Sequence, residues 1–307
     1  MKNVVLRLIA SSTVCAAALV PLAHADTGKL LLTGGVSSVD GAAGGGLTPW
    51  AVIGTNATDG EKGVSAFATR VGTRDYGLNV FGAALAVNDR FEFSLAQQDF
   101  DTKGTGTALR LPGLRLKQTI AGVKARVAGD AILDSDTLMP QVAVGLEYKT
   151  LGSTGLDGTL DRLGAKRSGV DAYVSATKLL LKDSVLLNAT LRATKANQNG
   201  LLGYGATLGT GENRYSVQPE FSVAYLVSKN VVVGAEYRFM RNKLKSAGQA
   251  AQLGDGLRAS DWKDVFVAWA PTKHFSVTLA YVDLGVIVPA VAAKKQTGFY
   301  LSGQLAF

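Results

Sequence analysis

Residues 214–225 read Arg-Tyr-Ser-Val-Gln-Pro-Glu-Phe-Ser-Val-Ala-Tyr. From Tyr215 onward, side chains that are apolar or aromatic occupy every second position, and mostly polar ones lie between them. Successive side chains of a β-strand point to opposite faces, so this stretch predicts a strand with one apolar and one polar face. Residues 140–149 and 231–241 repeat the pattern.

Short polar turns divide the chain from about residue 76 onward, and they alternate with long connections rich in Gly and Lys. The turns lie at 88–89, 130–136, 182–184, 228–230 and 272–274. The long connections lie near 101–116, 150–168, 196–213, 242–260 and 286–296. Short connections at one end and long ones at the other are typical of a transmembrane β-barrel, with turns in the periplasm and loops outside.

A soluble antiparallel sandwich also has one apolar and one polar face. The runs here have the length of roughly 9–11 residues that a tilted strand needs to cross a bilayer, whereas strands of soluble sheets are usually about five or six residues long. Run length and the alternation of short and long connections therefore favour a membrane barrel.

The pattern predicts an up-and-down barrel of about twelve antiparallel strands, although ten or fourteen remain open because 64–72 alternates poorly. The predicted strands are 64–72, 76–87, 91–100, 117–128, 139–149, 169–180, 185–195, 214–226, 231–241, 261–270, 275–285 and 297–307.

The first 25 residues are predicted to be an export signal. Lys2 and Arg7 form its positive end, residues 8–22 are apolar, and Ala23-His24-Ala25 is a small-x-small cleavage site. A lipoprotein signal at Cys15 is the alternative, but the residues before it lack the usual pattern. Cleavage after Ala25 removes the chain's only cysteine and lowers the net charge from +8 to +6.

The last strand ends in Phe307, with Phe299, Leu301 and Leu305 on the same face. This ending resembles the C-terminal signal of bacterial outer-membrane barrels, which the insertion machinery reads as a terminal aromatic preceded by alternating apolar residues. It departs from that signal in having Leu305 where an aromatic is common, and Gly303 on the lipid face. The resemblance implies the outer membrane as location and the barrel insertion machinery as a partner.

Residues 26–62 break the strand pattern, because glycines lie at 34–35, at 41 and at 44–46. A nucleotide-binding loop would need a Lys followed by Ser or Thr after the glycines, and Leu47-Thr48-Pro49 does not supply it. The segment is either a periplasmic leader, a first hairpin, or a plug of small residues inside the lumen of the barrel. The barrel itself is predicted to span 63–307.

Two stretches of this segment carry a further resemblance. They are Gly28-Lys29-Leu30-Leu31-Leu32-Thr33-Gly34-Gly35-Val36-Ser37-Ser38 and Thr48-Pro49-Trp50-Ala51-Val52-Ile53-Gly54. They resemble the start of a porin-like family of proteobacterial outer-membrane β-barrel proteins, a domain of unknown function. The resemblance continues through the barrel and implies neither an activity nor catalytic residues.

The sequence offers little support for an enzymatic or a metal-binding function. Outer-membrane hydrolases use a histidine to activate serine or water, and after the signal only His274 remains, in a predicted periplasmic turn. Asp130, Asp134 and Asp136 cluster in another turn, but their spacing does not match a calcium loop. We expect no enzyme, no catalytic residue, no metal site and no cofactor.

If the apolar face meets lipid, eleven charged side chains point into the lumen. Isolated buried charges cost several kcal/mol or more, so these residues either pair and fill the barrel or line a water-filled pore. They are Glu92, Lys124, Arg126, Glu147, Lys149, Asp171, Arg192, Arg214, Glu220, Glu236 and Arg238.

The long loops carry the net positive charge of the processed chain, with sums of +2, +1, −1, +2 and +2 along the sequence. Basic loop residues facing an anionic leaflet bind lipopolysaccharide phosphates or attract an acidic solute. Nucleic acid is not expected, because stacking aromatics do not accompany the basic residues. The basic residues concerned are Lys103, Arg110, Arg115, Lys243, Lys245, Arg258, Lys294 and Lys295.

The leading functional hypothesis is a channel or facilitator for a small solute, with a preference for anions suggested by the loops. A structural or surface-interaction barrel with a sealed lumen is the alternative, and an outer-membrane hydrolase ranks third.

Overall fold

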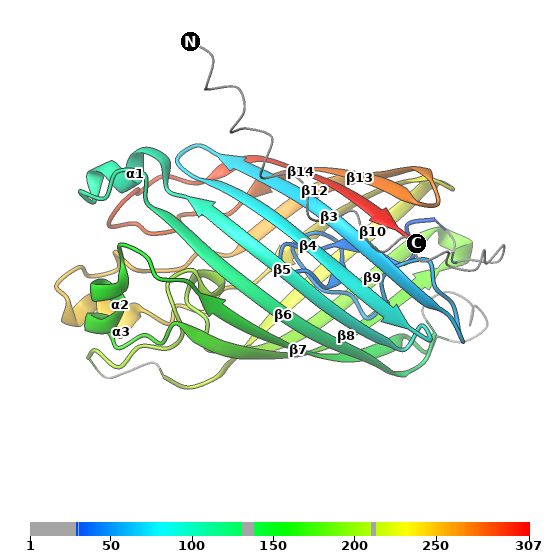
Figure 1. Ribbon diagram of the computed structural model, residues 1–307, viewed down its shortest axis with the longest axis horizontal. Coiled ribbons are helices and arrows are strands. Elements are labelled where there is room, and N and C mark those ends of the chain that lie inside the picture. Colours follow the sequence, from blue (N-terminus) through cyan, green and yellow to red (C-terminus); the bar gives the residue numbers. More distant parts are fainter. Residues whose placement is uncertain (1–28, 30, 131–137, 210–212) are drawn as a thin grey trace, which may run out of the picture.

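The computed structural model describes residues 29, 31–130, 138–209 and 213–307, so the predicted signal peptide lies outside the described residues. Within them, twelve antiparallel strands form one closed barrel (Figure 1). Each strand pairs with its neighbours in the sequence, and the last pairs with the first through Gly298↔Thr73 to Ala306↔Ser65. The predicted antiparallel barrel of about twelve strands is confirmed.

The barrel strands follow the sequence in order and agree with the predicted ranges to within a few residues. They are β3 (Lys62–Thr73), β4 (Gly77–Val87), β5 (Phe91–Asp101), β6 (Arg115–Ala128), β7 (Gln141–Leu151), β8 (Ser168–Leu180), β9 (Val185–Thr194), β10 (Ser216–Ser228), β11 (Val231–Arg238), β12 (Trp262–Thr272), β13 (Phe275–Asp283) and β14 (Thr297–Ala306). A separate two-stranded hairpin precedes them, formed by β1 (Val36–Ser37) and β2 (Ala43–Gly44).

Alternating side chains give the wall an apolar exterior and a polar interior. In β10, Phe221 is 48% exposed and Val223 47%, whereas Glu220 is fully buried and Ser222 is 5% exposed. A closed barrel satisfies every backbone group between strands, so its outer face can meet hydrocarbon without an unpaired edge. The periodicity in the sequence therefore sets which side chains face outward.

The two ends of the barrel differ, as the connections predict. The long connections contain short helices, which the sequence did not predict, and the three α-helices among them gather at one end, opposite the C-terminus (Figure 1). The helices are α1 (Lys103–Ala108), α2 (Asp157–Leu163), η3 (Gln198–Gly200) and α3 (Lys245–Ala250), while η2 (Leu181–Asp183) lies in a short turn. In the part of the chain that is described, no helix combines the length and apolarity that crossing a membrane requires.

The uncertain first strand is well formed, and β3 is longer than the predicted 64–72. Buried and exposed side chains alternate strictly from Lys62 to Thr73. The pattern looked poor in sequence because both faces carry small residues, among them Ala66 and Ala68 outside and Ser65 inside. Burial alternates here although hydropathy does not.

We predict that Leu279→Arg, at the middle of the outer face of β13, destabilises the folded barrel. Leu279 is 50% exposed on the apolar exterior, and a charge facing the bilayer midplane costs about 2–4 kcal/mol. Urea unfolding in lipid vesicles measures the loss. Leu253→Arg in the long β11–β12 connection is the control, and an equal effect of both substitutions would contradict a lipid-covered exterior.

Candidate functional site

Residues 31–57, which we call the lumen segment, lie inside the barrel and include the β1–β2 hairpin (Figure 1). Acidic side chains of the wall bind the backbone of this segment. The Glu236 carboxylate on β11 accepts a hydrogen bond from the Leu47 N–H at 2.7 Å. The Glu92 carboxylate on β5 accepts one from the Ala43 N–H at 2.9 Å. The lumen is therefore occupied by a segment of the same chain, and side chains of the barrel wall bind that segment.

Glycine lets the segment fold this tightly against the wall. A Cβ added at Gly44 would lie 1.9 Å from the carbonyl oxygen of Thr48, and one added at Gly45 would lie 2.3 Å from Oε1 of Glu236. Residues with a side chain cannot make these close approaches, whereas glycine can. The Gly-rich run thus serves packing within a narrow lumen, which explains its composition.

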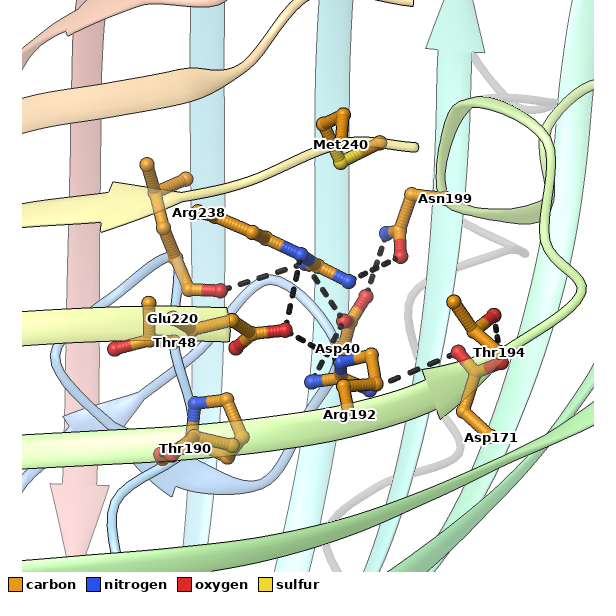
Figure 2. Close-up of polar contacts among 12 residues, drawn as sticks. Asp40, Thr48, Asp171, Thr190, Arg192, Thr194, Asn199, Glu220, Arg238 and Met240 are labelled. Carbon is orange, nitrogen blue, oxygen red and sulfur yellow. Dashed lines mark hydrogen bonds and ion pairs between the residues drawn. The ribbon is translucent and has the colours of Figure 1, made fainter. Parts of the chain in front are cut away.

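Asp40, at the tip of the β1–β2 hairpin, lies among three cations from the wall, and Figure 2 shows two of them, Arg192 and Arg238. Its Oδ2 is 3.2 Å from Nζ of Lys149, 3.2 Å from Nη1 of Arg238 and 3.9 Å from Nη2 of Arg192. Burial raises the pKa of the Asp40 carboxyl, but the three cations and the Asn199 amide outweigh burial and hold that pKa well below its usual range. Asp40 is therefore a buried anion that the wall stabilises.

The same cations pair with three acids of the wall. Nη1 of Arg192 lies 2.6 Å from Glu147, and its Nε lies 2.6 Å from Glu220. Lys149 lies 3.1 Å from Asp171. We call this group the central charge cluster: Asp40, Glu147, Lys149, Asp171, Arg192, Glu220 and Arg238. Its four acids and three bases are all almost completely buried.

A second buried pair holds the lumen segment on another side of the barrel. Nζ of Lys124 lies 3.1 Å from Glu92. The same ammonium group donates to the carbonyl oxygens of Ala43 at 3.0 Å and of Val52 at 2.7 Å. An ammonium group buried in this way needs several acceptors to replace water, and the lumen segment supplies most of them.

The connection between β9 and β10 folds into the barrel from the opposite end and meets the lumen segment. Gln198, Asn199 and Gly200 in η3 are buried. Asn199 donates through Nδ2 to Asp40 at 2.7 Å and accepts through Oδ1 from Arg238 at 2.9 Å (Figure 2). The lumen is closed by two segments that meet at one carboxylate.

The structure brings nine of the eleven predicted lumen residues into the interior, where each is at most 3% exposed. Six belong to the central charge cluster, four of them from β7, β8 and β9 and two from β10 and β11. Glu236 on β11 binds the lumen segment, and Glu92 and Lys124 form the second pair. The nine are Glu92, Lys124, Glu147, Lys149, Asp171, Arg192, Glu220, Glu236 and Arg238.

Arg126 and Arg214 lie elsewhere. Arg126 is partly exposed and pairs with Asp89 at 3.1 Å and with Asp130 at 3.4 Å, beside the short turns. The prediction for Arg214 is wrong, because β10 begins at Ser216 and Arg214 is exposed in the long connection before it. The alternation of a strand does not extend past its end.

Sequence reasoning missed several interior polar residues, among them Asp40, Asn199 and Asp264. Asp40 lies outside any alternating run, and Asn199 belongs to a connection expected to lie outside the barrel. Asp264, 6% exposed, stands opposite Glu236 in the pairing of β11 with β12. Only Asp264 had a signal in the sequence, because Val265 and Val267 mark the outer face of its strand.

The residues of the predicted insertion signal lie on the exterior of β14 and at the C-terminus. Phe299, Leu301, Leu305 and Phe307 are 63%, 53%, 48% and 46% exposed. His274 lies in the β12–β13 turn, with Nδ1 2.9 Å from the carbonyl oxygen of Ala306 and its ring stacked on Phe307. These contacts give His274 a structural role at the end of the last strand.

The acidic turn can be described only in part, because Asp134 and Asp136 lie outside the described residues. Asp130 pairs with Arg126. Across the described ranges, no group of three or more His, Cys, Asp or Glu residues is placed to hold a metal ion.

The fold is a closed antiparallel β-barrel with a filled lumen, and it is similar to the folds of outer-membrane porins. The NanC porin has a TM-score of 0.50 at 8% identity, over 79% of this chain and 98% of that chain. The KdgM porin has a TM-score of 0.48 at 9% identity, over 79% and 99%. Outer membrane phospholipase A from Escherichia coli has a TM-score of 0.39 at 10% identity, over 82% and 94%. At these identities the likeness concerns the fold alone.

The chain belongs to the family described as protein of unknown function (DUF3034), whose model matches residues 33–304. The match includes most of the lumen segment as well as the barrel, so both are parts of one family pattern. The predicted resemblance to a porin-like outer-membrane family is confirmed. No curated protein matches the sequence.

We predict that Asp40→Asn destabilises the protein by about 3–5 kcal/mol, the usual cost of removing one partner of a buried ion pair. The substitution removes the carboxylate that Lys149, Arg192 and Arg238 all contact. Urea unfolding of the refolded protein measures the change. Asp59→Asn is the control, since Asp59 is exposed just beyond the lumen segment. Equal stability of the two variants would show that the three cations do not depend on Asp40.

Proposed function

We propose that this chain is a channel for small solutes in the bacterial outer membrane, closed by its own lumen segment and opened when that segment moves. The observation that carries the proposal is the lining of the barrel beneath the segment. The nine predicted wall residues there carry ionisable groups, and six of them bind the lumen segment directly. Water would solvate those groups if the segment moved aside, so the wall suits a hydrated pore.

The cost of burying charge supports the same proposal. Replacing a buried ion pair by apolar residues of similar volume is often neutral or stabilising. A lumen filled only for stability therefore gains little from seven buried charges in one cluster. The charges are explained if the lumen segment and the wall must separate, because water can then solvate the charged groups on both surfaces.

A sealed structural barrel is the second candidate, and one observation favours it. Trp50 and Val52 of the lumen segment pack with Leu179, Leu186 and Val232 of the wall in a continuous apolar cluster. Displacing the segment exposes this cluster to water, which opposes opening. The two candidates thus differ in whether the segment moves.

Anion preference rests on the charge of the loops and stays a prediction, as does binding of lipopolysaccharide phosphates. Part of that charge is already compensated, because Arg115 pairs with Asp99 at 2.8 Å and with Asp101 at 3.2 Å. We propose further that the chain is not a hydrolase, on the ground that His274 is engaged with Ala306 and Phe307. Lipid hydrolysis by the purified protein that is lost in His274→Ala would contradict this proposal.

A disulfide between the lumen segment and the wall tests the channel. Oγ1 of Thr48 and Oγ of Ser222 on β10 lie 2.6 Å apart, close enough for Thr48→Cys and Ser222→Cys to form a disulfide, whose Cβ atoms lie about 3.5–4.5 Å apart. Cys15, the chain's only cysteine, lies in the predicted signal, so no other thiol competes.

We expect conductance steps in planar bilayers from the reduced double variant, and their loss on oxidation because the tethered segment cannot move. Each single cysteine variant, with and without reductant, is the control. Steps that persist after oxidation would contradict gating by the lumen segment. An absence of steps above background in the unsubstituted and reduced proteins would instead favour the sealed barrel.

A further inference from the structure

An apolar cavity of about 340 Å³ lies between the lumen segment and the long connections. This volume falls within the range of roughly 300–1,000 Å³ found for pockets that hold small organic ligands. Its surface is almost entirely apolar, and all five long connections contribute aliphatic side chains to it, among them Leu114, Leu160, Leu201, Leu257 and Val288. We call this space the loop chamber.

The lining of the loop chamber is unusual for loops that extend beyond a membrane barrel. Leu160 and Leu201 are almost fully buried, and they belong to connections that are otherwise polar and rich in glycine. An apolar space that no side chain fills forfeits dispersion contacts and lowers stability. Apolar side chains converging on unfilled space are therefore better explained by an occupant than by folding.

Two buried polar atoms in the lining lack a hydrogen-bond partner. Oε1 of Gln198 is an acceptor, and Nε1 of Trp262 is a donor. Gln198 is 4% exposed and Trp262 8% exposed, so solvent reaches neither freely. Buried polar groups are normally paired, and a hydroxyl, which both donates and accepts, can satisfy either atom.

We propose that the loop chamber binds a free, uncharged small molecule with a hydrocarbon body and one hydroxyl-type polar group. The floor of the chamber is formed by Val39 and Leu47 of the lumen segment, so an occupant touches the part of the chain that closes the barrel. If this ligand is also the transported solute, the inference rests on the proposed function. Binding does not require transport, so the binding proposal and the channel proposal can each be wrong while the other is right.

Trp262 provides the probe, because it lines the chamber and a brominated ligand quenches nearby tryptophan. The test protein has the substitution Trp269→Phe, which removes a lipid-facing tryptophan that is 48% exposed. This variant is reconstituted in nanodiscs of unbrominated lipid. The ligands are a bromoalkanol and a bromoalkane of equal chain length. A further Trp262→Phe substitution reports the signal that remains from Trp50.

We expect saturable quenching by the bromoalkanol, at least tenfold weaker in Val288→Phe/Leu257→Phe, where two larger side chains fill the chamber. Val223→Phe/Leu279→Phe makes the same changes on the lipid face, where Val223 is 47% and Leu279 50% exposed, and should bind as the parent does. Gln198→Met should weaken the bromoalkanol on the order of threefold to tenfold, as expected for one hydrogen bond, and leave the bromoalkane unchanged.

Quenching that rises with concentration without saturation would show partition into the bilayer and overturn the proposal. Equal binding by the chamber-filling and lipid-face variants would overturn it as well. A last arm uses lipid with brominated acyl chains and no added ligand. Quenching of Trp262 in that arm would place a lipid chain in the chamber instead of a free solute, whereas an unquenched Trp262 supports the proposal.

Discussion

The charge on Asp40 is the constraint on which the interior of this barrel depends. Three wall cations, Lys149, Arg192 and Arg238, converge on one space, and each must be compensated because it has almost no access to water. The three wall acids Glu147, Asp171 and Glu220 match these cations in number, and Asp40 of the lumen segment adds a fourth carboxylate where all three cations converge. The segment and the wall thus complete one electrostatic unit.

This dependence links features that lie far apart in the sequence. The glycines at 44 and 45 allow the segment to approach Glu236, and the hairpin turn then places Asp40 within reach of the cations. The β9–β10 connection reaches the same point from the loop side through Asn199. Closure of the lumen is therefore cooperative, because disturbing either segment disturbs the same charged centre.

The interior divides into two chemically distinct zones. Ionised groups and backbone amides surround the lumen segment, while aliphatic side chains surround the loop chamber above it. Val39 and Leu47 lie at the boundary, on the segment that also carries Asp40. An occupant of the apolar zone would contact the segment that fills the polar zone, which is the physical route from binding to opening that the two proposals imply.

The sequence by itself determined the wall: the twelve strands, their order, the lipid-facing side chains and nine of the eleven charges assigned to the interior. Alternation with a period of two is a local property, so it can be read without knowing the partners of a strand. It failed at Arg214, where the strand had not begun, and was faint in β3, where small residues occupy both faces. Only the tertiary structure decided where Asp40 lies, that Asn199 turns inward, and that leucines of five connections enclose one chamber. Those positions depend on contacts between segments separated by up to about two hundred residues, and irregular backbone has no periodicity that would reveal them.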